Sequence, residues 1–433
     1  MRPRVAALLA WGGWSALLAC ALRILLDYPI CANDESAWIQ IARQLDRGVD
    51  WPVSGPAFVD LLRQTAWYTA FSPAQVMPWL GVAGVFVVVC GLGWGYARLG
   101  LTRLLPLFAT LALSSYFWAP LLEARPQQWG QLAVFLGSIS VWRWLQQRGG
   151  LAFFVALPCV AFTHILSHAV LVFLCCFLVA ADSITQRRWS RRHLLVVLSL
   201  AASLAVYGWP DGPYAAMLQD LAQAHLQHWP LGLADSVTVL SLAALLGLLL
   251  LWATQGFWRQ AFQWPAAIAA LLLRHRRSTA WALGSAAIAV LAVQAYLLPP
   301  EAWDPYEGSW LRFAVFQSGN LMFAAFFLIG AGRWLMGLHP SRIDPVMTRF
   351  LVWALLGFAL LGLLSVTVSW WLLHTNWFLR VLNYGIFFAA VPAAIGVEQL
   401  SRHWPGLRRN ALLAAGTAAS LVCVVRPPLL LGC

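Results

Sequence analysis

The chain contains no lysine, and charged residues of either sign are scarce. Only 10% of its 433 residues are charged, whereas soluble domains carry about 25%. With 61% hydrophobic residues, the chain cannot cover a water-soluble surface. Every basic residue is arginine, whose rigid fork of donors suits phosphate, but a GC-rich genome produces the same bias. The absence of lysine therefore excludes little, whereas the shortage of charge excludes a soluble globular protein.

The sequence also lacks the residue spacings that hold metals or disulfides. Its eight cysteines lie mostly inside apolar runs, so we predict them to be small buried hydrophobes. We predict no metal site and no cofactor, although a divalent metal stays open. Residues 17–20 are similar to a lipoprotein cleavage box, but the apolar run continues through Leu26, which favours an uncleaved first span.

The apolar runs are long enough for helices that cross a bilayer, which need about 20 residues each. The fold class that we predict is an all-α polytopic membrane protein, a single transmembrane domain over 1–433 with about 11–13 transmembrane helices. The predicted spans are 5–26, 76–97, 104–120, 129–145, 151–164, 166–181, 194–209, 236–254, 280–298, 313–331, 350–371, 381–399 and 411–425.

Charge alternates between the loops that join these spans. One alternate set of loops holds most of the arginines, and the other holds most of the acidic residues. The positive-inside rule then places the arginine set and the N-terminus in the cytoplasm, and the acidic set in the periplasm. We therefore predict a multi-pass protein of a bacterial inner membrane. The net charge of +12 reflects this orientation, and no nucleic-acid partner is predicted.

Two outer loops are large, at 27–75 and 208–235. In the first, residues 36–45 and the residues after Pro56 have helical periodicity, which predicts two amphipathic helices lying along the membrane interface. The predicted apolar faces are Trp38, Ile41, Ala42 and Leu45 in the first helix, and Phe58, Leu61, Leu62, Thr65 and Trp67 in the second.

Two carboxylates, Asp34 and Glu35, follow the first span on the outer side. A carboxylate there can act as a general base on a substrate that approaches from outside. The same pair, with Asn33 before it, also suits the N-cap and first turn of a helix. Both roles stay open, and they are compatible with each other.

Glu123 and Arg125 lie at the outer end of the third predicted span. Ionisable residues beside the hydrocarbon boundary are candidates for function. The alternative is local, because the two charges can neutralise each other in a short loop while Pro126 starts the next helix.

Histidines and an arginine supply further candidates. His164 and His168 have the i, i+4 spacing of zinc ligands, but no third ligand is evident nearby, which favours a polar turn or a contact to substrate phosphate. His374 and Arg380 precede the twelfth predicted span on the outer side. Arg380 is suited to bind a phosphate through two hydrogen bonds, and snorkelling toward lipid phosphates is its alternative.

Together these motifs resemble those of the GT-C glycosyltransferases, membrane enzymes that use polyprenyl-phosphate sugars, such as protein O-mannosyltransferases and aminoarabinose transferases. The first motif comprises Asp34-Glu35-Ser36-Ala37-Trp38, then Ala42, Leu45 and Gly48, followed by Gly55-Pro56. The second motif is Glu123-Ala124-Arg125-Pro126. The motifs lie mainly within residues 1–145. The chain departs from the family in lacking a large soluble C-terminal domain and an Asp-x-Asp metal motif.

The resemblance implies transfer of a sugar from a polyprenyl-phosphate donor, with inversion, at the periplasmic face of the lipid bilayer. The acceptor, whether protein, lipid or glycan, is not specified. Asp34 is then the expected base, and Glu35 the alternate base or the residue that orients the acceptor. The expected substrate-binding residues are Glu123, Arg125, His164, His168, Arg380, Trp38 and His374.

Two other functions compete with this interpretation. A transporter or flippase of a lipid-linked or anionic solute would carry charged or broken helices at mid-membrane and internal repeats. Here the ionisable residues gather at one surface and no repeat is evident. A surface-polysaccharide polymerase or ligase would place its arginines and histidines in one large late loop, whereas the largest outer loop here comes first.

Overall fold

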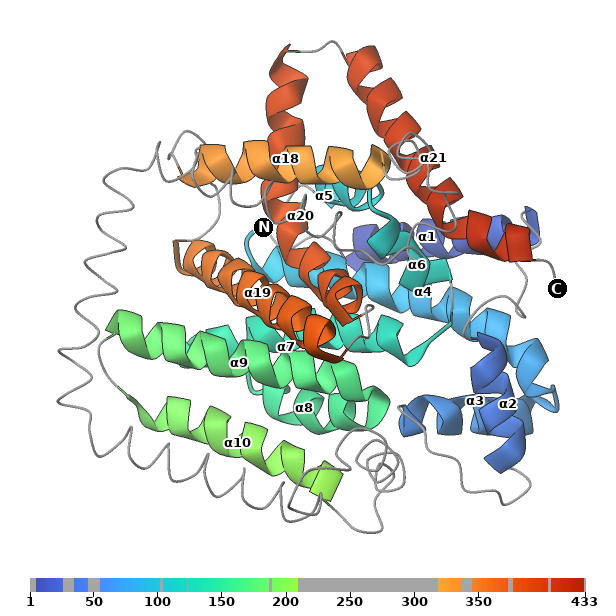
Figure 1. Cartoon of the computed structure of the whole chain (residues 1–433), viewed down its shortest axis with the longest axis horizontal. Coiled ribbons are helices and arrows are strands. Elements are labelled where there is room, and N and C mark those ends of the chain that lie inside the picture. Colours follow the sequence, from blue (N-terminus) through green and yellow to red (C-terminus); the bar gives the residue numbers. More distant parts are fainter. Residues whose placement is uncertain are drawn as a thin grey trace. The chain divides into compact units, whose positions relative to one another are not determined.

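The structure is a computed structural model that describes residues 5–25, 35–45, 55–101, 104–122, 124–186, 189–208, 318–335, 345–372, 377–403 and 406–431. Its regular secondary structure in these ranges is entirely α-helical, which confirms the predicted all-α class for this part of the chain (Figure 1). The predicted spans 236–254 and 280–298 and the loop 208–235 beyond Gly208 lie outside the described residues.

Three of the described helices are long and apolar enough to cross a membrane. They are α1 (Val5–Leu25), α4 (Pro73–Arg98) and α9 (Ile165–Gln186). Helix α1 exposes large apolar side chains, with Trp14 at 72% and Ile24 at 73% exposure. Lipid solvates such a surface without the free-energy cost that water imposes. These features indicate a helical protein that is associated with a membrane.

Contacts divide the chain into two compact units. The first comprises Met1–Asp34, Gly81–Ala124 and Ala269–Cys433. It holds α1, most of α4, α5 (Leu104–Leu111), α6 (Ser115–Leu122), α18 (Ser318–Leu335), α19 (Pro345–Leu372), α20 (Trp377–His403) and α21 (Gly406–Leu431). The second comprises Glu35–Leu80 and Arg125–Ile268. It holds α2 (Glu35–Leu45), α3 (Pro56–Thr69), the start of α4, α7 (Pro126–Leu145), α8 (Ala152–Thr163), α9 and α10 (Arg191–Gly208).

The core of the first unit is built on a close crossing of α18 and α20. A Cβ atom at Gly330 would collide with the carbonyl of Pro392, and one at Gly396 with the carbonyl of Phe326. Glycine at both positions lets the two backbones approach, as small residues do in membrane helix pairs. A buried cluster surrounds the crossing, formed by Leu113, Phe326, Ala393 and Val397.

The predicted third span, 104–120, is wrong as a continuous helix. The helix is broken after Leu111, and α6 begins at Ser115. Asn320 of α18 accepts hydrogen bonds from Ser114 Oγ and Ser115 N, both at 2.9 Å, and Ser420 of α21 donates to the carbonyl of Leu113 at 2.5 Å. These partners satisfy backbone groups that the break leaves unpaired. They lie far away in the sequence, so hydropathy alone gives no signal for the break.

The second unit confirms the two predicted helices of the first outer loop, as α2 and α3. Ala42 is buried in α2 as predicted. Of the predicted apolar face of α3, Phe58 and Leu62 are buried, whereas Leu61 is 43% and Trp67 83% exposed. The buried residues of α3 are Phe58, Val59, Leu62 and Ala66. This buried face follows the i, i+4 spacing of a helix, and the placement of α3 along the membrane interface stays a prediction.

Candidate functional site

The acidic end of the first motif begins helix α2. Glu35 is the first residue of this helix and is fully buried, and a carboxylate in the first turn favours the positive end of the helix dipole. Trp38 packs edge-on against Phe58 of α3, with 5.7 Å between ring centroids. Helices α2 and α3 therefore pack against each other through this aromatic contact. Asp34, the expected base, lies outside the described residues.

The start of α3 packs against the start of α7 and the end of α8. A Cβ atom added at Gly55 would lie 2.7 Å from the carbonyl oxygen of Thr163 and 2.9 Å from Cβ of Pro126. Only glycine fits a space of this size. The Gly55-Pro56 and Arg125-Pro126 steps of the two motifs therefore lie against each other, inside one compact unit.

Arg125 occupies the N-cap position of α7, with extended backbone dihedrals (φ −140°, ψ 155°), and Pro126 is the first helical residue. Proline suits this position because its missing N–H would have no partner there. The structure therefore places the Arg125 side chain, which is half-buried, at the N-terminus of α7. Glu123 lies outside the described residues.

Sequence reasoning missed Arg23, in the last turn of α1. Its Nε donates a hydrogen bond to the carbonyl oxygen of Leu122 at 2.8 Å, where α6 ends. A cation at a helix C-terminus complements the negative end of the dipole. The signal was present in the sequence, since an arginine near the end of an apolar span calls for a polar partner.

His164 connects α8 to α9. Its backbone is extended (φ −164°, ψ 119°), and its Nδ1 accepts a hydrogen bond from the backbone N–H of Ser167 at 3.2 Å. The Oγ atom of Ser167 lies 2.8 Å from the same nitrogen. These bonds make His164 an N-cap for α9, which is the polar turn that the sequence favoured.

His168, one turn into α9, is fully buried. Its Nδ1 lies 2.6 Å from Tyr207 Oη and its Nε2 2.8 Å from Ser203 Oγ, both on α10. The two ring nitrogens thus join α9 to α10, while the ring of His164 bonds to Ser167. The structure does not bring the two imidazoles to a shared ligand, and a contact of His168 to substrate phosphate stays a prediction.

The remaining expected residues lie in or near the first unit. Arg380 falls in the first turn of α20, and its side chain is outside the described part. His374 lies outside the described residues. Within the second unit, α2, which carries Glu35 and Trp38, therefore packs on α3, and the start of α3 packs beside the residues next to Arg125 and His164.

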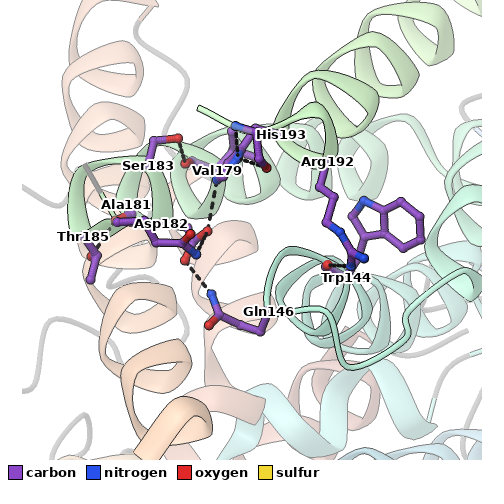
Figure 2. Close-up of polar contacts among 11 residues, drawn as sticks. Trp144, Gln146, Val179, Ala181, Asp182, Ser183, Thr185, Arg192 and His193 are labelled. Carbon is purple, nitrogen blue, oxygen red and sulfur yellow. Dashed lines mark hydrogen bonds and ion pairs between the residues drawn. The ribbon is translucent and has the colours of Figure 1, made fainter. Parts of the chain in front are cut away.

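A second polar cluster joins the ends of α7, α9 and α10 (Figure 2). Asp182 of α9 is 2% exposed, and its carboxylate accepts hydrogen bonds from Nε2 of Gln146 at 2.5 Å and of Gln186 at 2.7 Å. Nε2 of His193 lies 3.0 Å from the same carboxylate. Arg192 adds a hydrogen bond to the carbonyl of Trp144 at 2.9 Å. The arginines around this cluster belong to the loops that we predict to be cytoplasmic.

Ser190, His193 and Asp182 form a chain of contacts that has the composition of a hydrolase triad. Ser190 Oγ lies 2.6 Å from Nδ1 of His193, but the backbone N–H of Ser190 also donates to Nδ1 at 3.0 Å. This is the geometry of a capping box, with histidine in place of glutamate at the third helical position. The cluster is therefore a clamp between helix ends, and its serine is a cap.

Three glutamines in α7 also escaped sequence reasoning. Gln127, Gln128 and Gln131 are 7%, 1% and 2% exposed. Their signal was available, because three amides within five residues at the start of a predicted span are costly in a membrane protein.

The described ranges contain no cluster of three or more His, Cys, Asp or Glu residues that could hold an ion. No protein-family model, no curated protein and no solved structure matches the chain.

Proposed function

We propose that the chain is a membrane glycosyltransferase of the GT-C type, which moves a sugar from a polyprenyl-phosphate donor to an acceptor. The protein spans a bacterial inner membrane about 11–13 times, with its N-terminus in the cytoplasm and its active site on the periplasmic face. The two sequence motifs that resemble this family support the proposal, and so does the arrangement of arginine-rich and acidic loops.

The observation that carries the proposal is the contact between Gly55 and Pro126. It joins the end of the first motif to the second motif, although about seventy residues separate them in the sequence. Shortly before the same outer loop, Arg23 of α1 bonds to Leu122, the residue before Glu123. The first contact lies within the second unit and the second within the first unit, and each involves a residue that flanks Glu123-Ala124-Arg125.

The chemistry follows from these groups. The acceptor hydroxyl oxygen forms a bond to the anomeric carbon of the sugar while the bond from that carbon to the phosphate oxygen breaks. The hydroxyl proton passes to Asp34, and the polyprenyl phosphate leaves with the bonding electron pair. Arg125 and Arg380 stabilise the negative charge on the phosphate, a contribution that is often the largest in such transfers. Attack from the face opposite the leaving group inverts the anomeric carbon.

The experiment that tests the proposal measures sugar transfer from a radiolabelled polyprenyl-phosphate sugar by the purified full chain in bicelles. We expect Asp34→Asn with Glu35→Gln to abolish transfer and to leave the unfolding midpoint nearly unchanged. The matched control is Asp60→Asn, an exposed carboxylate of the same loop that pairs with Arg63 at 3.5 Å. Transfer by the double variant at the wild-type rate would overturn the assignment of the base.

The break between α5 and α6 favours one second candidate, a transporter or flippase, since broken helices form solute sites in such proteins. Asn320 and Ser420, however, already occupy the polar groups at the break. A flippase would move a fluorescent lipid-linked sugar across a proteoliposome membrane without changing it. The glycosyltransferase that we propose releases the polyprenyl phosphate and leaves the transbilayer distribution of the donor unchanged.

A further inference from the structure

The first two turns of α7 carry three buried amide side chains, those of Gln127, Gln128 and Gln131. All three are more than nine-tenths buried. Within the described part of the chain, no hydrogen-bond partner reaches Nε2 of Gln127, Nε2 or Oε1 of Gln128, or Nε2 of Gln131. The set therefore presents three unpartnered donors and one unpartnered acceptor.

The three amides share one side of the helix. At 3.6 residues per turn they fall within about 100° of one another, with Gln131 between the other two. The side of α7 that packs on α9 is a different one, marked by Gly130 against Ser167 and by Gly137 at 3.1 Å from Leu171. Packing of α7 on α9 therefore does not account for the glutamines.

Buried polar groups without partners are rare, because each forfeits the hydrogen bonds that it made in water. Glutamine is also a poor choice for a buried helix face that only packs, where an apolar residue of the same volume has no such cost. Three such residues on one side of a helix indicate a binding surface that is completed by a ligand.

We propose that Gln127, Gln128 and Gln131 bind the hydroxyl groups of a neutral sugar. An amide offers both a donor and an acceptor, and so does each sugar hydroxyl. The three side chains carry no charge, so a neutral sugar suits them better than an aminosugar, whose cation would need a buried counter-charge. This inference rests on the proposed glycosyltransferase function and names the sugar class that it uses.

The position of the glutamines fits a sugar attached to a lipid phosphate. They follow Arg125, the N-cap of α7, whose side chain has donors only and cannot accept hydrogen bonds from the first-turn N–H groups. The N-terminus of a helix favours an anion. The phosphate then lies at the N-terminus of α7, and the sugar lies one to two turns along the helix, against the amides.

The test measures binding to the full chain in detergent by native mass spectrometry. The probes are farnesyl phosphate mannose, farnesyl phosphate, and methyl mannoside, which stands for an acceptor sugar. The variants are Gln128→Met and Gln131→Met. The matched control is Gln146→Met, at the other end of α7, where the amide bonds to Asp182.

In the wild type we expect farnesyl phosphate mannose to bind more tightly than farnesyl phosphate. We expect Gln128→Met to lower the affinity for the mannose ligand about tenfold, which two lost hydrogen bonds produce, and to leave that for farnesyl phosphate unchanged. If Gln128→Met lowers the affinity for methyl mannoside alone, the result also supports the sugar site and assigns that site to the acceptor sugar.

If the wild type prefers the mannose ligand and both variants keep that preference in full, water alone solvates the amides and the inference is overturned, while the proposed function stands. If the wild type binds farnesyl phosphate mannose no better than farnesyl phosphate and does not bind methyl mannoside, the proposed function is overturned, and the inference with it. A variant that fails to fold is recognised by its unfolding midpoint, and the other variant then decides.

Discussion

Two substitutions of glutamine by methionine in the same helix are expected to change stability in opposite directions. Gln128 is buried with both polar atoms unpartnered among the described residues, whereas Gln146 donates to the buried carboxylate of Asp182 at 2.5 Å. An unsatisfied buried group costs about 1–3 kcal/mol, and a hydrogen bond to a charged group contributes about 1.5–3 kcal/mol. Gln128→Met removes two unsatisfied atoms at about 1 kcal/mol each, so it should raise the free energy of unfolding of the ligand-free chain by about 2 kcal/mol. Gln146→Met removes one hydrogen bond to a charged group and should lower that free energy by about 2 kcal/mol.

The assay is denaturant unfolding of the purified chain in bicelles, followed by tryptophan fluorescence and repeated with and without farnesyl phosphate mannose. Saturating ligand should reduce the advantage of Gln128→Met, because only the wild type then gains its hydrogen bonds. If Gln128→Met destabilises the ligand-free chain by 1 kcal/mol or more, on the order of one lost hydrogen bond, the glutamine is a structural residue and the reasoning is refuted.

Three further substitutions test the packing. Asp182→Asn should lower the free energy of unfolding by about 3 kcal/mol, because an amide cannot accept from every donor around this buried site. The control, Asp60→Asn, changes an exposed carboxylate and should alter the free energy of unfolding by less than about 0.5 kcal/mol. Equal changes in the two variants would contradict the role of Asp182 as a clamp between helix ends. Gly396→Leu should lower the free energy of unfolding by about 3 kcal/mol, because the new side chain would overlap the carbonyl of Phe326. A variant that keeps the native fold and the wild-type melting temperature would contradict the close crossing of α18 and α20. Asn320→Leu should speed hydrogen exchange at the backbone N–H of Ser115, which loses its acceptor, and unchanged protection there would contradict the described break.

Much of the helical architecture could be predicted from hydropathy, because each span must satisfy its own backbone hydrogen bonds. Helices α1, α4 and α9 lie where the apolar runs placed them. The break at Ser114 could not be predicted, because its hydrogen-bond partner, Asn320, comes from a distant helix. Local periodicity placed Phe58, Leu61 and Leu62 on one apolar face of α3, and the structure buries Phe58 and Leu62 while Leu61 is exposed.

The site was only partly accessible to sequence reasoning. Motif spacing made Glu35 and Arg125 candidates, and the structure places Gly55, which precedes α3, against Pro126, which follows Arg125. Arg23 and the three glutamines were not predicted, because they lie inside apolar spans and the candidates were drawn from the outer loops. The role of the glutamines depends on their burial and on the lack of partners among the described residues, and that of Arg23 on its bond to Leu122, which are properties of the packed chain and not of its sequence.

The most direct test of where the sugar donor binds is a cryo-electron microscopy map of the full chain with farnesyl phosphate mannose. We predict that the phosphate lies within hydrogen-bond distance of Arg125 at the N-terminus of α7, and that the sugar lies against Gln128. Ligand density at the opposite end of the unit, beside Arg191 and the Asp182 clamp, or at the break between α5 and α6, would contradict it.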